Sequence, residues 1–315
     1  RGEKSAGEEV GTLGRVNAGG QSSQPRQRTE TVMLRTALLA RRAGKHGVAA
    51  IRRCSAAPPS PAAVIIPARY GSTRFPGKPL APILGQPMVV HTMLRAQQAT
   101  SVQLVAVATD HGAILEAVEA AGGTAVLTPS DCATGTDRVW AALCEVRTHL
   151  ARSFDIVINV QGDEALVDPS HIDLLVGHMR ACPSDDMATL AAPIKTREDF
   201  DNPNTVKVVT SSRGYALYFS RAGIPHGTSG SPGGGWGLKH VGVYAFRSSF
   251  LEEFVRLPES KLQQTESLEQ LKVLEAGHRI RVISVASAGP DVNVPSDIAR
   301  VEGCLRDQGC GVGRV

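Results

Sequence analysis

The stretch VIIPARYGSTRFPGKPL, residues 64–80, decides the fold of this chain. It begins as an unbroken apolar run, which is typical of a strand buried on both faces of a parallel sheet. It continues as a loop rich in glycine and proline that carries three cations, Arg69, Arg74 and Lys78. Such a loop lets backbone N–H groups approach an anion closely while its cations surround a polyphosphate. The alternative, a solvated basic loop, accounts poorly for three cations beside a buried strand.

The residues that follow alternate short β-rich runs with helical segments. Strands are predicted at 62–68, 104–110, 124–128 and 155–164, and helices at 86–99, 111–123, 135–150 and 168–182. This order predicts a mostly parallel, Rossmann-like sheet with right-handed crossovers. The fold class is therefore α/β, with three α/β/α layers.

After residue 186 the alternation becomes less regular. Strands are predicted at 187–194, 205–212, 214–222, 239–247 and 279–286, and helices at 247–256, 265–276 and 295–307. The stretch GTSGSPGGGWG at 227–237 predicts a mobile loop. We expect one domain over residues 62–307 with a smaller mixed β region in its second half, followed by a tail at 308–315.

Residues 1–61 differ in charge from the rest of the chain. They carry 11 Lys/Arg against 4 Asp/Glu, whereas the remainder carries 23 against 26. The part of this segment that starts at Met33 holds six Lys/Arg and no acid, and its apolar residues can share one helical face. It resembles an organellar transit peptide, mitochondrial ahead of chloroplast. The alternative is a plain basic disordered tail, which would leave the protein cytoplasmic.

The composition of the body argues against several classes of protein. A net negative charge after residue 61 and 4% aromatic residues disfavour a nucleic-acid-binding surface. No run of 18 apolar residues occurs, so no transmembrane helix is expected. The six cysteines form no C-x-x-C pair and none has zinc spacing with a histidine, which predicts free thiols in a reducing compartment.

Two further segments carry candidate chemistry. Asp163 and Glu164 follow a buried strand, and ligands of open α/β sheets bind beyond the carboxyl ends of strands. A carboxylate there, facing a phosphate loop, suits Mg²⁺, although either acid could instead cap the next helix. Gly135 and Thr136 open a helix whose free N–H groups can bind a base carbonyl or a phosphate. The alternative is that Thr136 is an ordinary N-cap.

Seven blocks in order then resemble one family, the 3-deoxy-manno-octulosonate cytidylyltransferases. They are the opening segment, V-A-T-D, G-T-D-R, V-Q-G-D-E, A-L-Y-F-S-R, K-H-V-G-V-Y and L-E-Q-L-K-V-L. The resemblance covers about residues 62–307. It implies a homodimeric nucleotidyltransferase fold, with the mixed β region used for dimerisation. It also implies Mg²⁺-dependent transfer of CMP from CTP to 3-deoxy-D-manno-octulosonate (Kdo), giving CMP-Kdo and pyrophosphate.

The resemblance also implies roles for individual residues. Catalytic groups are Arg69, Arg74, Lys78 and Asp163. The nucleotide side comprises Ala68, Arg69, Gly71, Ser72, Lys78, Gly135, Thr136, Arg138 and Gln161. The sugar side comprises Gln161, Arg221, His240, Tyr244, Glu269 and Gln270. Without the resemblance, His240 and Tyr244 are polar residues flanking a strand, and Glu269 and Gln270 are the solvated face of a helix.

One departure from the family pattern concerns the metal. The family has V-D-T-P near its C-terminus, with the Asp as a second metal ligand, whereas this chain has Asn293 in that place. Asn is a neutral, weaker oxygen ligand, and Asp291 lies two residues earlier on the same side of an extended segment. Ala165, where the family usually has proline, is a lesser change. We therefore keep two alternatives open: a nucleotide-binding protein that has lost turnover, and a cytidylyltransferase acting on sialic acid.

Overall fold

The computed structural model describes residues 59–71, 75–226, 237–290, 292 and 294–307. Residues from Ala56 onward form one compact unit. The transit-peptide prediction at Met33 and most of the loop predicted at 227–237 fall outside the described residues.

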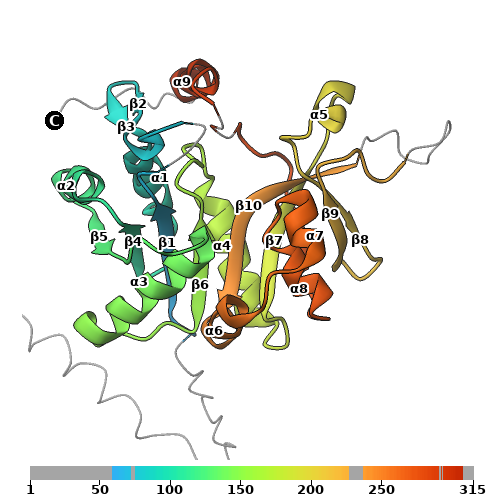
Figure 1. Ribbon diagram of the computed structural model, residues 1–315, viewed down its shortest axis with the longest axis horizontal. Helices are drawn as coiled ribbons and strands as arrows, with labels where there is room; N and C mark the ends of the chain where they lie inside the picture. Colours follow the sequence, from blue (N-terminus) through green and yellow to red (C-terminus); the bar gives the residue numbers. More distant parts are fainter. Residues whose placement is uncertain (1–58, 72–74, 227–236, 291, 293, 308–315) are drawn as a thin grey trace, which may run out of the picture. The chain divides into compact units, whose positions relative to one another are not determined.

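The centre of the sheet is β1 (Ala62–Ala68), whose residues are all buried. It pairs in parallel with β4 (Leu104–Thr109) on one side and with β6 (Ile156–Val160) on the other. The strand β5 (Thr124–Leu127) extends the parallel part beyond β4. These four strands were all predicted, because their apolar runs suit a sheet covered on both faces. Figure 1 shows them side by side.

The second half of the sheet is mixed. The strand β10 (Leu238–Arg247) runs antiparallel between β6 and β7 (Met187–Pro193), and β11 (Arg281–Ser284) lies parallel beyond β7. The strands β8 (Lys207–Thr210) and β9 (Ala216–Ser220) form an antiparallel pair joined to the start of β10. Because β10 is reversed, its beginning lies at the same edge as the carboxyl ends of β1 and β6.

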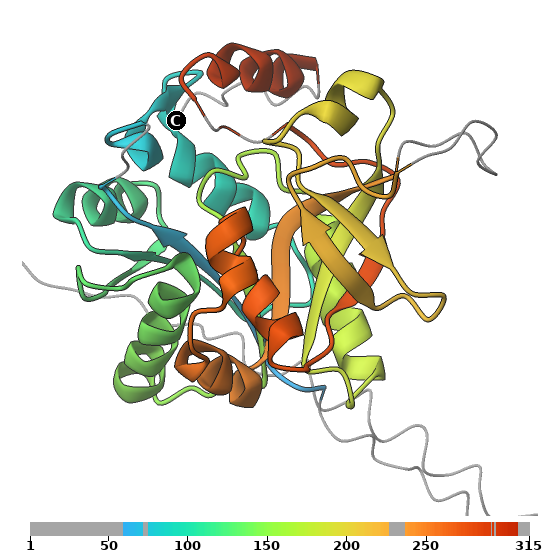
Figure 2. The same cartoon turned by 45° about the vertical axis from the view of Figure 1, so that its right-hand side comes forward.

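Helices cover both faces of the sheet, as predicted (Figures 1 and 2). One face packs against α1 (Met88–Ala96), α2 (Gly112–Ala120) and α4 (Pro169–Ala181). The other packs against α3 (Gly135–Leu150), α6 (Ser248–Arg256) and α8 (Leu271–Glu275). The molecule therefore has three layers with a hydrophobic core on each side of the sheet.

A third, smaller core lies beyond the carboxyl edge of the sheet. It joins α9 (Asp297–Asp307) to the short hairpin β2 (Pro82–Ile83) and β3 (Gln86–Pro87), which follows the 3-10 turn Lys78–Leu80. Ala165 is fully buried in this core beside Val292. The Glu302 carboxylate accepts a hydrogen bond of 2.9 Å from the Leu84 backbone N–H. The C-terminal helix thus returns to the segment that follows the cationic loop.

The structure corrects three sequence predictions. The helix expected at 265–276 is two helices, α7 (Lys261–Glu266) and α8, because Ser267 adopts a left-handed conformation with φ 53°. The helix α5 (Arg197–Asp201) was not predicted. Neither was the β2–β3 hairpin, because two-residue strands are too short to show a period in the sequence.

Two predictions about composition can be compared with the described part of the chain. None of its helices is both long and apolar enough to cross a membrane. The four cysteines within it, Cys132, Cys144, Cys182 and Cys304, are free.

Candidate active site

A cleft of about 570 Å³ opens at the carboxyl edge of the sheet. Its walls come mainly from four segments that are far apart in the sequence: the end of β1, the 3-10 turn, the start of α3 and the loop after β6. Met88 of α1 and Ser267, between α7 and α8, complete the lining. The lining residues are Pro67, Ala68, Arg69, Lys78, Pro79, Met88, Cys132, Ala133, Thr134, Gly135, Arg138, Gln161, Gly162, Asp163 and Ser267. The structure therefore brings the cationic loop, the strand-end acid and a helix N-terminus together. Arg74 and Ser72 lie outside the described residues, and Gly71 is exposed.

An ion pair closes one side of the cleft. Lys78 Nζ lies 2.5 Å from Asp163 Oδ2, and both side chains keep some exposure, 15% and 30%. Gly77 turns the loop in the left-handed conformation, φ 67°, and its N–H donates to the Tyr70 carbonyl. A Cβ on Gly162 would lie 2.9 Å from the Pro67 carbonyl oxygen, so only glycine lets β1 and the β6 loop approach this closely.

Asp163 also has the chemistry of a hard-cation ligand. Its second oxygen, Oδ1, makes no hydrogen bond within the described part of the chain, and it lies on the cleft. The backbone N–H of Val292 donates to the Asp163 carbonyl at 3.5 Å, so the C-terminal segment passes beside this acid. The other two predicted metal ligands, Asp291 and Asn293, lie outside the described residues.

Glu164 differs from its neighbour. It is buried, with 8% of its surface exposed, and a Cβ on Gly242 would lie 3.3 Å from its Oε1. It does not cap the next helix, because α4 is capped by Asp168, which accepts from the Ser170 N–H. Glu164 therefore lies beside the middle of β10 and does not line this cleft.

Asp110, which follows β4, was not among the predicted site residues. One of its oxygens accepts from Arg138 Nη2 at 2.9 Å, and the other accepts from the Tyr70 backbone N–H at 3.1 Å. The Arg138 side chain is almost fully buried, and it also donates to the Thr128 hydroxyl at 2.7 Å. The Tyr70 ring stacks on His111 at 4.0 Å. Asp110 therefore ties the cationic loop to the wall formed by α3, which the V-A-T-D block alone could not reveal.

The N-terminus of α3 is capped by Thr134, not by Thr136 as the alternative held. The Thr134 hydroxyl accepts from the Asp137 N–H, and the Asp137 carboxylate accepts from the Thr134 N–H, which is a capping box. Both threonine hydroxyls donate to Glu269, Thr134 to Oε1 and Thr136 to Oε2, each at 2.7 Å. The start of α3 is thereby fastened to the segment between α7 and α8.

A chain of hydrogen bonds continues from Glu269 across the sheet. Asn159 Nδ2 donates to the Thr136 hydroxyl at 3.4 Å, and Gln161 Nε2 donates to Asn159 Oδ1 at 3.2 Å. Partial burial raises the pKa of the Glu269 carboxyl, while its threonine donors and Lys272 oppose the rise. These hydrogen bonds hold the Gln161 side chain between Gly135 and β10. A Cβ added to Gly135 would lie 3.4 Å from Gln161 Oε1.

His240 and Tyr244 lie on the face of β10 that packs against α8, with their ring centroids 5.3 Å apart. Burial, helped by the charge of Lys239, lowers the pKa of the His240 imidazole to about 3, so the ring is neutral. A hydrogen bond of 3.0 Å joins its Nε2 to the Thr189 hydroxyl. Burial, with Glu269 and Glu164 adding to it, raises the pKa of the Tyr244 phenol. Tyr244 therefore stays a neutral hydroxyl.

Gln270 and Arg221 complete the predicted sugar side. Gln270 is the N-cap of α8 and is buried, and its Nε2 makes no hydrogen bond within the described residues. Arg221 follows β9, and its Nη2 lies 3.4 Å from the carbonyl of Ser267 on the cleft wall. Glu269 and Gln270 thus lie in the turn between α7 and α8, two and three residues after Ser267 of the cleft wall, and not on the solvated face of a helix.

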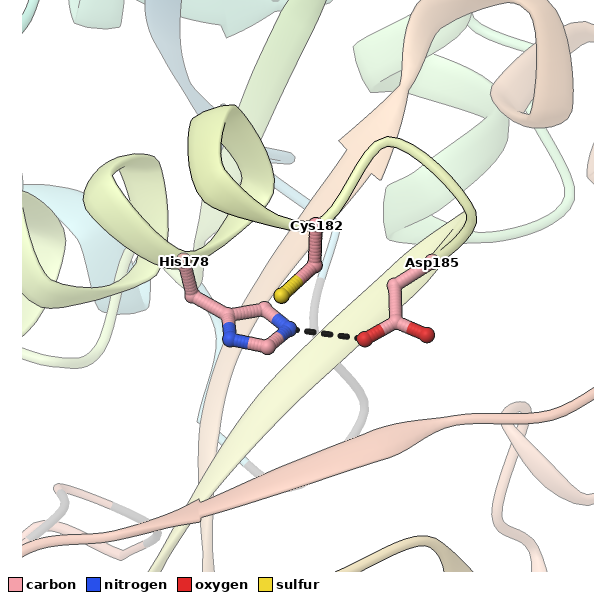
Figure 3. Close-up of side chains that lie close together, drawn as sticks. All are labelled: His178, Cys182 and Asp185. Atoms are coloured by element: carbon pink, nitrogen blue, oxygen red, sulfur yellow. Dashed lines mark hydrogen bonds and ion pairs between the residues drawn. The ribbon is translucent and has the colours of Figure 1, made fainter.

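A second cluster of metal-ligating types lies at the opposite edge of the sheet (Figure 3). His178 Nε2 lies 2.8 Å from Asp185 Oδ2, beside Cys182. Asp185 also accepts from the Tyr215 hydroxyl and from Arg281 Nε, and these hydrogen bonds lower the pKa of its carboxyl against the effect of burial. Both oxygens are in use and a guanidinium is adjacent, so the cluster serves as a structural hydrogen-bond centre.

Comparisons with known proteins agree with this geometry. The family model described as cytidylyltransferase matches residues 63–280. The chain is 49% identical to the 3-deoxy-manno-octulosonate cytidylyltransferase of Anaeromyxobacter sp. (strain Fw109-5), over 77% of this chain and 96% of that protein. It is 49% identical to that of Yersinia pseudotuberculosis serotype O:1b, over 78% and 98%.

A solved structure is also similar. It is a CMP:2-keto-3-deoxy-manno-octonic acid synthetase complexed with CTP, with TM-score 0.72 and 43% identity over 79% of this chain and 100% of that one. Fold and cleft therefore define a nucleotidyltransferase. The chain belongs to the 3-deoxy-manno-octulosonate cytidylyltransferase family, as the sequence blocks indicated.

The Asp110 contacts lead to a prediction. Asp110→Ala removes the acceptor for both Arg138 and Tyr70, so the cationic loop loses its fixed position. Because hydrogen bonds to charged groups contribute about 1.5–3 kcal/mol, we expect KM for CTP to rise roughly tenfold or more. Initial rates with each substrate varied in turn measure this.

Asp173→Ala is the matched control. Asp173 accepts hydrogen bonds from Thr100 and Ser101 at the opposite edge of the sheet. The control should lower the melting temperature and leave both KM values unchanged. An unchanged KM for CTP in folded Asp110→Ala contradicts the positioning role.

Proposed function

We propose that this cleft transfers CMP from CTP to the anomeric hydroxyl of Kdo and releases pyrophosphate. The observation that carries the proposal is the Lys78–Asp163 pair, which stands where the ends of β1 and β6 face the open N-terminus of α3. The sugar hydroxyl attacks the α-phosphorus in line, so negative charge develops on the α-phosphoryl group and on the departing pyrophosphate. Cations and backbone N–H groups that are already in place stabilise that charge.

The nucleotide side is the part of the cleft between the cationic loop and α3. Arg69 and Lys78 line it, and their charges are available to the phosphates together with the predicted Arg74 and Ser72. Ala68, Gly71, Gly135 and Thr136 contribute backbone and small side chains, which allow close approach. Arg138 acts differently: its guanidinium is held by Asp110 and Thr128, so it supports the wall of the cleft.

The sugar side is the part of the site near β10. Kdo carries one carboxylate and several hydroxyls, and the nearby groups match that chemistry. Gln161, Gln270 and the neutral phenol of Tyr244 can donate hydrogen bonds to hydroxyl oxygens, while Glu269 can accept from them. His240 is neutral and buried, so it serves as a hydrogen-bonding group and not as a cation. Arg221 supplies the positive charge for the carboxylate.

Mg²⁺ is the metal that the donor set suits. The carboxylate of Asp163 is one hard oxygen ligand, and the triphosphate brings several more. Bound there, the ion would polarise the α-phosphoryl oxygens and help to lower the pKa of the attacking hydroxyl. Asp291 and Asn293 are the further candidate ligands. Asp163 is already paired with one cation, the ammonium of Lys78, at this point of the cleft.

The β8–β9 pair is the proposed dimer contact. The strand β9 pairs only with β8 among the described strands, and Leu217 on it is 62% exposed. An uncovered edge strand with an exposed large apolar residue favours association with a second chain. Organellar import through the segment from Met33 stays a prediction.

Pyrophosphate release with CTP, Mg²⁺ and a panel of 2-keto sugar acids tests the function. We expect turnover with Kdo. A higher rate with a sialic acid than with Kdo would identify sialic acid as the substrate instead. Absence of pyrophosphate with every sugar, despite CTP binding, would show a binding protein that has lost turnover.

The ion pair makes a prediction about rate. Lys78→Ala and Asp163→Asn should each lower kcat by roughly 10²–10³, since each removes one charge-stabilising group from the reaction centre. The fold should persist because both side chains are partly exposed at a cleft. Steady-state pyrophosphate release measures the change. Arg256→Ala, which removes an exposed cation paired with Glu252 on α6, is the control and should leave kcat intact. Near-normal turnover of a folded Lys78→Ala or Asp163→Asn variant would contradict the catalytic role of that residue.

The substitution at the second metal position makes another prediction. Asn293→Asp should lower the Mg²⁺ concentration for half-maximal rate and raise kcat, because a carboxylate binds the ion more strongly than an amide does. A Mg²⁺ titration of both proteins measures this. If neither quantity changes, Asn293 is not a metal ligand. If Asn293→Asp releases pyrophosphate and the native protein does not, the native protein is a nucleotide-binding protein that has lost turnover.

A further inference from the structure

The side chain of Lys207 is a buried charge outside the lining of the cleft. The residue belongs to β8 and is 0% exposed. Its ammonium donates to three backbone carbonyls, those of Asn202 at 2.9 Å, Thr205 at 2.5 Å and Arg221 at 2.6 Å. These three bonds use all three of its protons. No carboxylate is among its hydrogen-bond partners within the described part of the chain.

This arrangement is a poor way to stabilise a fold. An ammonium that leaves water without a paired carboxylate keeps a desolvation cost, and an apolar side chain of similar volume often packs there as well or better. The charge of Arg221 adds to this cost because it opposes that of Lys207, while the carboxylates of Asp201 and Glu266 offset part of it. A buried ammonium with these properties is therefore a candidate for a role in the site.

The three carbonyls have one feature in common, which is that they surround Arg221. One belongs to Arg221 itself. The other two, from Asn202 and Thr205, flank Pro203, whose carbonyl accepts from Arg221 Nη1 at 3.1 Å. Lys207 thus holds the backbone of Arg221 and also the loop on which its guanidinium rests.

The opposite side of Arg221 is held by the end of α7. Its Nε donates to the Glu266 carbonyl at 2.8 Å, and its backbone N–H donates to the Glu266 carboxylate at 2.8 Å. Its Nη2 reaches the carbonyl of Ser267 on the cleft wall. Three of the five guanidinium N–H groups are used in this way. One remains on each terminal nitrogen, and such a pair can bind a carboxylate in a bidentate manner.

We propose that Lys207 is a positioning residue for the sugar substrate: by holding the carbonyls of Asn202, Thr205 and Arg221, it fixes the Arg221 guanidinium toward the carboxylate of the sugar acid. The inference rests on the proposed function only in taking a sugar acid as substrate.

The first test is Lys207→Met, which keeps the volume and removes the three hydrogen bonds. We expect KM for Kdo to rise roughly 10- to 100-fold, the effect of losing an oriented charge-assisted contact, with KM for CTP within about twofold of the native value. Initial rates with each substrate varied, and the melting temperature, are measured on the full chain. Lys207→Gln retains an N–H donor. Its KM for Kdo should therefore lie between that of the native protein and that of Lys207→Met.

Arg247→Met is the matched control. Arg247 is another cation bound to backbone carbonyls, those of Met179, Cys182 and Pro183, at the opposite edge of the sheet. It should lower the melting temperature and leave both KM values unchanged. Equal rises in both KM values for Lys207→Met, or no rise in a folded variant, overturn the proposal. If neither Lys207 variant folds while Arg247→Met does, the ammonium is structural and the proposal is wrong.

The second test adds Lys207→Met to Arg221→Ala. Because Lys207 acts through Arg221, the double variant should have a KM for Kdo within about twofold of that of Arg221→Ala alone. The coupling is overturned if Lys207→Met raises KM for Kdo in the Arg221→Ala background as much as it does in the native protein. It is also overturned if Arg221→Ala alone leaves KM for Kdo unchanged. Turnover of the native protein with Kdo is measured beside these variants. A failure of the proposed function therefore appears in the native protein, and a failure of this inference appears only in the variants.

Discussion

Parallel pairing of β1 with both β4 and β6 is the constraint on which the rest of the structure depends. It places the carboxyl ends of three strands at one edge, so the cationic loop, Asp110 and Asp163 emerge beside one another. The glycine at 162 permits the closest approach, since any Cβ would collide with the Pro67 carbonyl. Without this register, the charges of Lys78 and Asp163 would not meet.

The site is held by three kinds of support that differ in chemistry. Asp110 is an ionic link between the loop and α3. A chain of hydrogen bonds crosses the sheet. It joins the Glu269 carboxylate to the threonines at the start of α3 and continues to the amide of Gln161. Lys207 and Glu266 hold Arg221 through backbone carbonyls and a backbone N–H. Each support connects segments distant in sequence, so each substrate side has its own scaffold.

Burial sets the protonation states of two groups on the proposed sugar side. His240 is kept neutral and Tyr244 is kept protonated, so neither carries a charge there. The cations of this region include Arg221 and also Lys272, whose ammonium lies 4.0 Å from the Glu269 carboxylate. On the nucleotide side the cations stay partly exposed, and they can bind phosphates that arrive from solvent. The proposed site thus places the phosphates beside Arg69 and Lys78, and the sugar beside the neutral side chains of His240 and Tyr244.

The sequence by itself determined the three layers, the parallel strands and the identity of the family. These follow from local patterns: apolar runs for buried strands, glycine and proline for the loop, and ordered blocks of residues. It did not determine the break at Ser267, the hairpin at Pro82–Pro87 or the cap at Thr134, because these depend on which backbone groups find partners after packing. Only the tertiary structure showed the hydrogen-bond partners of Asp110 and Lys207. Their partners lie on other elements, and the worth of a buried charge is decided by the groups that surround it.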